Sequence, residues 1–147
     1  MKRNTAHLSL IDRIADRIRS IKDRREKPKQ RSRIVEKTGE RLEAWVKAGR
    51  HLEQHGSLDE IIEELDVTGE ELSLYSKMVL KKKFRTWLKE IRLEEAKKLL
   101  LSRPDVPAYQ IGFEVGITDK SNFRKEFKEH TGLTPKEWRD RAAGAKE

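Results

Sequence analysis

A short segment in the last third of the chain spaces basic and polar residues so that they can bind a polyanion. Asp119 is a good N-cap residue and predicts that a helix begins after it. Phe123 and Phe127 are four residues apart, so they share one face of that helix, which we expect to point inward. The outward face then carries Lys120, Ser121, Arg124 and Lys125. These side chains offer cations and hydrogen-bond donors.

The residues before Asp119 predict a second helix and the turn that joins the two. Ile111 and Val115 lie on one helical face and are expected to be buried. Gly112 leaves room for the following helix to cross closely, and Gly116 can adopt the positive φ of a tight turn. Helix, glycine turn and basic second helix together predict a helix-turn-helix with an exposed recognition face.

The residues that follow predict how the recognition helix ends and what closes the unit. Gly132 is a typical C-terminal residue for a helix. Thr134 and Glu137 have the spacing of a capping box, and Pro135 occupies the favoured first helical position. A short closing helix is therefore expected from there onward, with Trp138 in it.

The stretch from residue 111 to residue 139 resembles the C-terminal signature of the AraC/XylS family, which consists of tandem helix-turn-helix transcription regulators. The departures are mild, because Gly112 replaces an Ala, Ile117 replaces a Phe and Lys125 replaces an Arg. The order of predicted helices extends the resemblance to about residues 40–140. It implies an all-α fold with two helix-turn-helix units joined by a long central helix.

The residues themselves support that organisation. Ser57–Glu60 and Thr68–Glu71 are spaced as capping boxes and predict an upstream helix pair. A long amphipathic helix follows from about Phe84, and Pro104 stops it. No segment has the alternation of a strand, so we expect seven or eight helices.

The resemblance also assigns roles to particular side chains. It implies base-edge contacts from the downstream recognition helix by Lys120, Ser121, Asn122, Arg124 and Lys125. Weaker phosphate contacts are expected from Lys81, Lys82, Lys83 and Lys136. A solvated basic surface is the alternative for each of these residues, and for the three consecutive lysines it explains the pattern equally well.

The upstream unit departs further from the family pattern. Leu74 stands where an Arg commonly points at DNA, and Ser76 stands where an inward Phe is usual. Residues 57–76 contain seven acidic residues and no Lys or Arg, and carboxylates oppose binding to phosphates. We therefore expect bases to be read mainly by the downstream unit. Weak docking of the upstream unit through Ser73 and backbone amides is the alternative.

The N-terminal segment lies outside the resemblance. Apolar residues recur there at helical spacing, with basic residues around them: Leu8, Ile11, Ile14, Ile18 and Ile21. The pattern predicts an amphipathic helix that self-associates or binds a partner through residues 8–25. Residues 24–33, which include Pro28, are expected to form a polar linker. The predicted division is a basic segment at 1–33, a DNA-binding domain at 34–142 and a tail at 143–147.

Composition excludes several classes of protein. The chain has 147 residues, a net charge of +8 and no cysteine, which excludes disulfides and thiolate chemistry. No apolar run approaches the roughly 20 residues of a membrane span, so a cytoplasmic, nucleoid-associated protein is expected. His51 and His55 have a zinc-compatible spacing but lack an evident third ligand, and we expect surface histidines. We expect no enzyme, no metal and no cofactor.

A sequence-specific DNA-binding transcription regulator, with double-stranded DNA as its partner, is the leading interpretation. One alternative is a protein-interaction module that has lost most DNA reading and binds a basic partner through its acidic upstream unit. Another is membrane-surface binding through residues 8–25. The sequence leaves open the operator, the regulated genes, activation or repression, the signal, the oligomeric state, the role of residues 1–33 and whether a longer regulator contains this chain.

Overall fold

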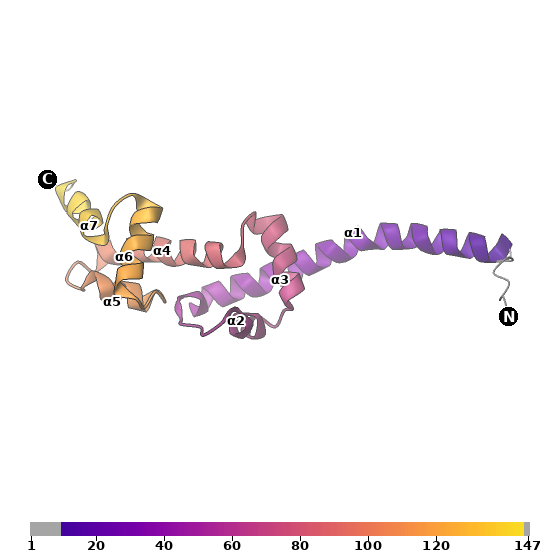
Figure 1. Cartoon of the computed structure of the whole chain (residues 1–147), viewed down its shortest axis with the longest axis horizontal. Helices are drawn as coiled ribbons and strands as arrows, with labels where there is room; N and C mark the ends of the chain where they lie inside the picture. The colour runs from indigo at the N-terminus through magenta and orange to yellow at the C-terminus, as the bar shows by residue number, and fades with distance from the viewer. Residues whose placement is uncertain (1–9, 146–147) are drawn as a thin grey trace, which may run out of the picture.

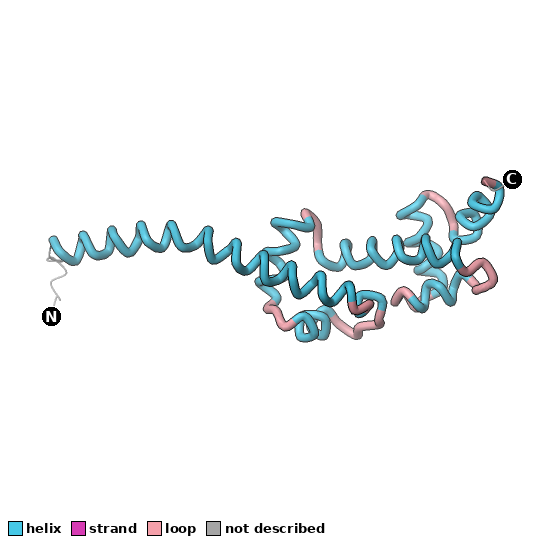
Figure 2. The backbone as a smooth tube through the Cα atoms, turned by 180° about the vertical axis from the view of Figure 1, so that it is seen from behind, coloured by secondary structure: helices cyan, strands magenta, loops and turns pink. Residues whose placement is uncertain are grey.

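The computed structural model describes residues 10–145, and within them the fold is entirely helical (Figures 1 and 2). The α-helices of this part are α1 (Leu10–Lys47), α2 (Leu58–Leu65), α3 (Gly69–Tyr75), α4 (Phe84–Ser102), α5 (Ala108–Glu114), α6 (Lys120–Thr131) and α7 (Pro135–Gly144). Two short segments join them, the 3-10 helix η1 (Arg50–Leu52) and the π-helical turn η2 (Ser76–Leu80). The all-α prediction is confirmed.

Two separate hydrophobic cores lie at opposite ends of α4 (Figure 1). The upstream core joins α1, α2, α3 and the start of α4 through Leu42, Trp45, Ile61, Leu65, Val67, Leu72, Phe84 and Leu88. The downstream core joins the rest of α4 to α5 and α6 through Leu93, Ala96, Leu100, Ile111, Val115, Ile117, Phe123 and Phe127, and the half-buried Trp138 of α7 packs on it. Each core supports one helix-turn-helix unit, and α4 is the predicted central helix.

The helices begin where the capping residues predict. Thr68 and Thr134 each form a complete capping box, with Glu71 and Glu137 respectively. Asp119 caps α6, because its Oδ1 accepts a hydrogen bond from the Asn122 amide at 2.6 Å. The box expected at Ser57 is only half formed. Ser57 Oγ accepts from the Glu60 amide, whereas the Glu60 carboxylate accepts from the Gly56 amide and not from Ser57.

The two glycines of the downstream unit have the expected roles. Gly116 has φ +89°, the left-handed conformation that the turn between α5 and α6 requires. A Cβ added to Gly112 would lie 2.6 Å from Cγ of Phe123. This glycine therefore allows α6 to approach α5 closely enough for Phe123 to be buried.

The polar linker predicted at residues 24–33 is wrong, because α1 is helical throughout this segment and contains Pro28. Lys, Arg, Gln and Glu dominate the segment and favour helix, whereas a proline removes only one backbone donor from the ladder. Burial, and not a break in the helix, separates the two parts of α1. Its side chains become partly buried from Ile34 onward. Residues 143 and 144, expected in the tail, belong to α7, and residues 1–9 and 146–147 lie outside the described part.

Two side chains differ from their expected environments. Phe113, an aromatic residue of a type that is usually buried, is 59% exposed. His55, expected at the surface, has a side chain that is only 5% exposed, because it packs against Trp45 and contacts Glu64. None of the described helices combines the length and apolarity that crossing a membrane requires.

Glu64 organises the surface of the upstream core. Its Oε2 accepts a hydrogen bond from the indole of Trp45 at 2.9 Å, and its Oε1 binds the Arg50 guanidinium at 2.6 Å. His55 Nε2 lies 3.1 Å from Oε2. These contacts, that of Trp45 first, lower the pKa of Glu64 to about 2. Potential metal-ligand atoms of Glu53, His55 and Glu64 lie within 4.8 Å of one another, and Arg50 is the cation that both carboxylates bind.

We expect Gly112→Ala to destabilise the downstream unit by about 1–3 kcal/mol, because the added methyl group would overlap Phe123. Urea unfolding followed by circular dichroism measures the change. Gly144→Ala is the control, since an added Cβ there meets nothing within 4 Å. The control should unfold at the wild-type midpoint or slightly above it. Equal midpoints for both variants would show that Phe123 moves aside at no cost.

Glu64 should make stability fall in acid. Its pKa in the folded chain, about 2, lies below the ordinary value, so the unfolded chain takes up the proton first. The contribution is complete above about pH 4.5 and is lost as the pH falls toward 2. Unfolding free energies measured from pH 6 to pH 2.5 should therefore depend less on pH in Glu64→Gln. Replacement of the neighbouring, exposed Glu63 by Gln should leave the pH dependence of the unfolding free energy as in the wild type. If Glu63→Gln reduced the pH dependence as much as Glu64→Gln, Glu64 would have no special role.

Candidate nucleic-acid interface

Helix α6 presents a polar, cationic face to solvent. Phe123 and Phe127 are 2% and 0% exposed, which fixes the rotation of the helix. Ser121 and Lys125 are exposed one helical turn apart. Because the buried pair holds the helix rigidly, these two side chains project from a defined platform, as direct contact with base edges requires.

Lys120 and Arg124 lie on the flank of that face, toward α5 and α7. Lys120 Nζ lies 4.3 Å from the ring centroid of Tyr109 in α5, a cation–π contact. Lys120 and Arg124 also line a surface hollow of about 540 Å³ with Tyr109, Pro135 and Lys136. The structure thus brings Lys136, expected to contact phosphate, next to two residues expected to contact bases.

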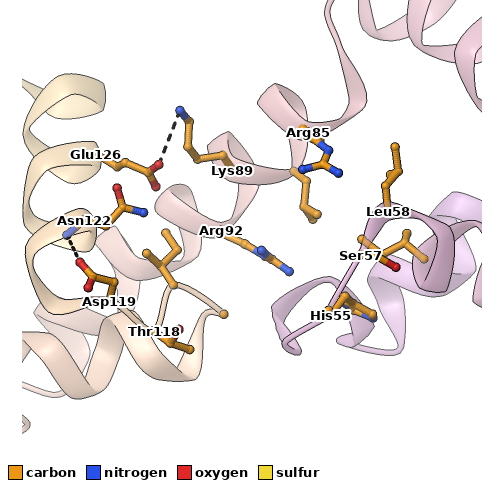
Figure 3. Close-up of a pocket in the computed structure, with 15 residues that line it drawn as sticks. His55, Ser57, Leu58, Arg85, Lys89, Arg92, Thr118, Asp119, Asn122 and Glu126 are labelled. Carbon is orange, nitrogen blue, oxygen red and sulfur yellow. Dashed lines mark hydrogen bonds and ion pairs between the residues drawn. The ribbon is translucent and has the colours of Figure 1, made fainter.

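Asn122 points in another direction. It lines a cleft of about 360 Å³ between the two units, together with Arg85, Lys89 and Arg92 of α4. Figure 3 shows its side chain beside Glu126, which forms an ion pair with Lys89 at 3.8 Å. Asn122 therefore lies on the opposite flank of α6 from Arg124, as their spacing of two residues requires, and the tertiary structure turns that flank toward the cleft.

The three consecutive lysines follow the upstream recognition helix. Lys81, Lys82 and Lys83 line a hollow of about 400 Å³ with Lys77, a cation that the sequence reasoning did not assign to the site. Lys81 adopts φ +58°, which reverses the chain before α4. Lys82 is already paired with Glu90 at 2.7 Å. Lys77, Lys81 and Lys83 have no ion pair among the described residues, so their charges can face an external anion.

The upstream recognition helix consists of α3 and the wider turn η2. Ser76 is 6% exposed, and its Oγ lacks a hydrogen-bond partner within the described part of the chain. Leu74 is half-buried and contributes no charge. Asp66 binds Arg41 of α1 at 2.7 Å, so one acidic group is paired with a cation, although its side chain stays exposed. The outward face of α3 therefore offers fewer donors for base edges than that of α6.

Arg92 connects the two units through α4. Its Nε donates to the carbonyl of His51 at 2.7 Å and its Nη2 donates to the carbonyl of Glu53 at 2.9 Å. The same guanidinium packs on the downstream turn, because a Cβ at Gly116 would lie 3.0 Å from both Arg92 Cζ and the carbonyl oxygen of Leu52. No pattern in the sequence predicted this contact, which fixes the upstream loop against the downstream turn.

Comparisons with known proteins agree with this geometry. A family model described as a helix-turn-helix domain matches residues 61–141. An uncharacterized transcriptional regulatory protein of Bacillus subtilis, YesN, is 41% identical over 64 residues, which are 43% of this chain. The match spans 17% of the length of that relative.

Solved structures share the fold. The C-terminal domain of AraT, a response regulator from Geobacillus stearothermophilus, superposes with a TM-score of 0.58 at 28% identity, covering 73% of this chain and 84% of that domain. A Listeria innocua protein of unknown function superposes with a TM-score of 0.57 at 24% identity, covering 67% and 93%. With two helix-turn-helix units on one central helix and a family match over more than half its length, the chain belongs to the AraC-type helix-turn-helix family.

Proposed function

We propose that this chain is a sequence-specific DNA-binding transcription regulator that reads bases mainly through α6. The observation that carries the proposal is the exposed cationic face of α6, which two buried phenylalanines hold in place. Family membership supports the same conclusion. A helix of this kind enters the major groove with its N-terminal half against the bases.

The individual side chains then take different parts. Ser121 and Lys125 are exposed on α6, and we assign them contacts with base edges in the major groove. Lys120 and Arg124, beside Tyr109 and Lys136, are placed at the edge of the same groove. Asn122 lines the cleft between the units. We therefore assign it a contact with DNA on the side of α6 that faces the upstream unit.

Phosphate contacts fit the cations that surround the two recognition helices. Lys136 lies in the first turn of α7, where free backbone amides add to its charge. It would exchange its exposed ion pair with Asp140, at 3.4 Å, for a phosphate. Lys81 and Lys83, with Lys77, would contact the backbone near the upstream unit, and Lys82 would first have to release Glu90.

We expect Lys125→Ala to weaken binding to a selected operator duplex by about 1–3 kcal/mol and to relax base preference locally. Fluorescence anisotropy measures the affinity, on a sequence first obtained by selection from random duplexes. Leu74→Ala, at the corresponding place in the upstream unit, is the matched comparison and should change the affinity little.

Three outcomes would contradict parts of this account. Equal losses on the selected and a scrambled duplex would reduce Lys125 to a phosphate contact. Loss of specific binding in Leu74→Ala or Ser73→Ala would show that the upstream unit reads bases. No salt-dependent DNA binding by the wild-type chain would favour the interaction module over a DNA-binding regulator.

Self-association through residues 8–25 remains a second proposal. Ile14, Ile18 and Ile21 are 51%, 61% and 49% exposed on α1, so this apolar stripe is not covered within the described part of the chain. Basic residues flank the stripe and would repel one another in a homodimer, so DNA or another polyanion would be needed to offset that repulsion.

Sedimentation velocity with and without a DNA duplex tests this proposal. We expect the complex with DNA to contain more than one protein chain, because the polyanion screens the basic flanks. Replacement of Ile14, Ile18 and Ile21 by Gln should restore a single chain per duplex and leave the helix content unchanged. A single chain per duplex for the wild-type protein at every concentration would refute self-association on DNA.

A further inference from the structure

The face that α3 turns toward α1 opens into a surface groove of about 1030 Å³, which is larger than the three hollows described above. Figure 1 shows α1 continuing past α3, beyond the upstream core, and Figure 2 shows the same extension from behind. One wall of the groove comes from the segment of α1 between residues 24 and 34. The other comes from α3 and its turn, with Thr68, Glu70, Glu71, Leu74 and Met78.

Cations dominate the α1 wall. Arg24, Lys27 and Arg31 are exposed and share one face, since they are three and four residues apart. None of the ion pairs among the described residues involves them. Exposed cations without a carboxylate partner retain their full charge for a partner outside the chain.

The α3 wall contains few carboxylates that could pair with these cations. Glu71 belongs to the capping box, where its Oε2 accepts from the Thr68 amide at 2.8 Å. Glu70 is the remaining carboxylate among the groove residues, and Leu74 and Met78 contribute apolar surface. Three cations therefore face two carboxylates, one of which is held in the capping box, and the remaining excess of positive charge favours a polyanion.

The groove is also continuous with the face that the upstream unit would present to DNA. Leu74 of the upstream recognition helix lines the groove beside α1. A duplex approaching the outward face of α3 would therefore meet Lys27 and Arg31. From residue 24 to residue 31 the helix rises about 10 Å, an axial distance over which one DNA strand carries about three phosphates.

We propose that the groove between α1 and α3 binds one strand of the DNA backbone, with Arg24, Lys27 and Arg31 as its phosphate contacts. The proposal rests on the DNA-binding function inferred above and extends it to a part of the chain outside the family match. The upstream unit then binds DNA through α1. Its own recognition helix, α3, forms the other wall of the groove and does not contact bases. The acidic residues of α2 and α3 no longer prevent binding, because the cations come from a different helix.

Two double variants with the same change of charge test the groove. Lys27→Gln with Arg31→Gln removes two groove cations. Lys29→Gln with Arg33→Gln removes two exposed cations from α1 that do not line the groove, at the same spacing of four residues. Fluorescence anisotropy with a random-sequence duplex of 40 base pairs, measured from about 0.05 to 0.3 M salt, gives the affinity and its salt dependence.

The groove variant should lower the affinity at 0.1 M salt by about tenfold or more and reduce the slope of log K against log salt by about two, because each lost phosphate contact removes about 0.9. The control variant should change both quantities by much less. Equal changes in the two variants would overturn the groove, since the effect would then be the overall charge of α1. No change in either would overturn it as well.

A third variant, Lys125→Ala, separates failure of the groove from failure of the proposed function. A loss in Lys125→Ala on the selected operator duplex, without a loss in the groove variant, would leave the DNA-binding function intact and refute the groove alone. Absence of DNA binding by the wild-type chain would refute both. Vesicles of phosphatidylserine and phosphatidylcholine address the other polyanion, and a groove variant that loses vesicle binding but keeps DNA affinity would overturn the proposal.

Discussion

The geometry of the two units depends on the guanidinium of Arg92. A long helix alone sets the distance between the two units, but it does not set how each unit is rotated about the helix axis. Arg92 supplies that constraint, because it donates to two carbonyls of the upstream loop and packs on the turn of the downstream unit. The charge is partly buried, so breaking these bonds would leave an unpaired cation and two unpaired carbonyls, which is unfavourable.

The C-terminal end of α4 is held by the same chemistry. Arg139 of α7 donates to the carbonyls of Leu100, Arg103 and Val106 at 2.6–2.9 Å. These carbonyls end α4 or follow it, where the helix cannot satisfy them itself. The indole of Trp138 donates to the carbonyl of Lys97 at 3.2 Å in addition. The guanidinium groups of Arg92 and Arg139 therefore fix the scaffold on which the two recognition helices pack. This scaffold sets the distance between the exposed faces of these helices.

The two units differ in where their positive charge comes from. In the downstream unit the cations belong to the recognition helix and to the start of α7. In the upstream unit α2 and α3 are acidic, and the cations come from Lys77 to Lys83 on one side and from α1 on the other. In the sequence, more than thirty residues separate the basic segment 24–31 of α1 from α3, although the fold places the two on opposite walls of one groove.

Local signals in the sequence determined the helices, their caps and the inward face of α6. Asp119, Thr134 and the pair Phe123 and Phe127 act over one or two helical turns, so their spacing was enough to predict them. Contacts between distant segments were decided by tertiary structure alone. Packing in three dimensions placed Asn122 in the cleft, Phe113 at the surface and His55 against Trp45. The described side chains between residues 24 and 33 are exposed, so helix propensity and not tertiary packing keeps α1 helical through Pro28, which removes one backbone hydrogen bond.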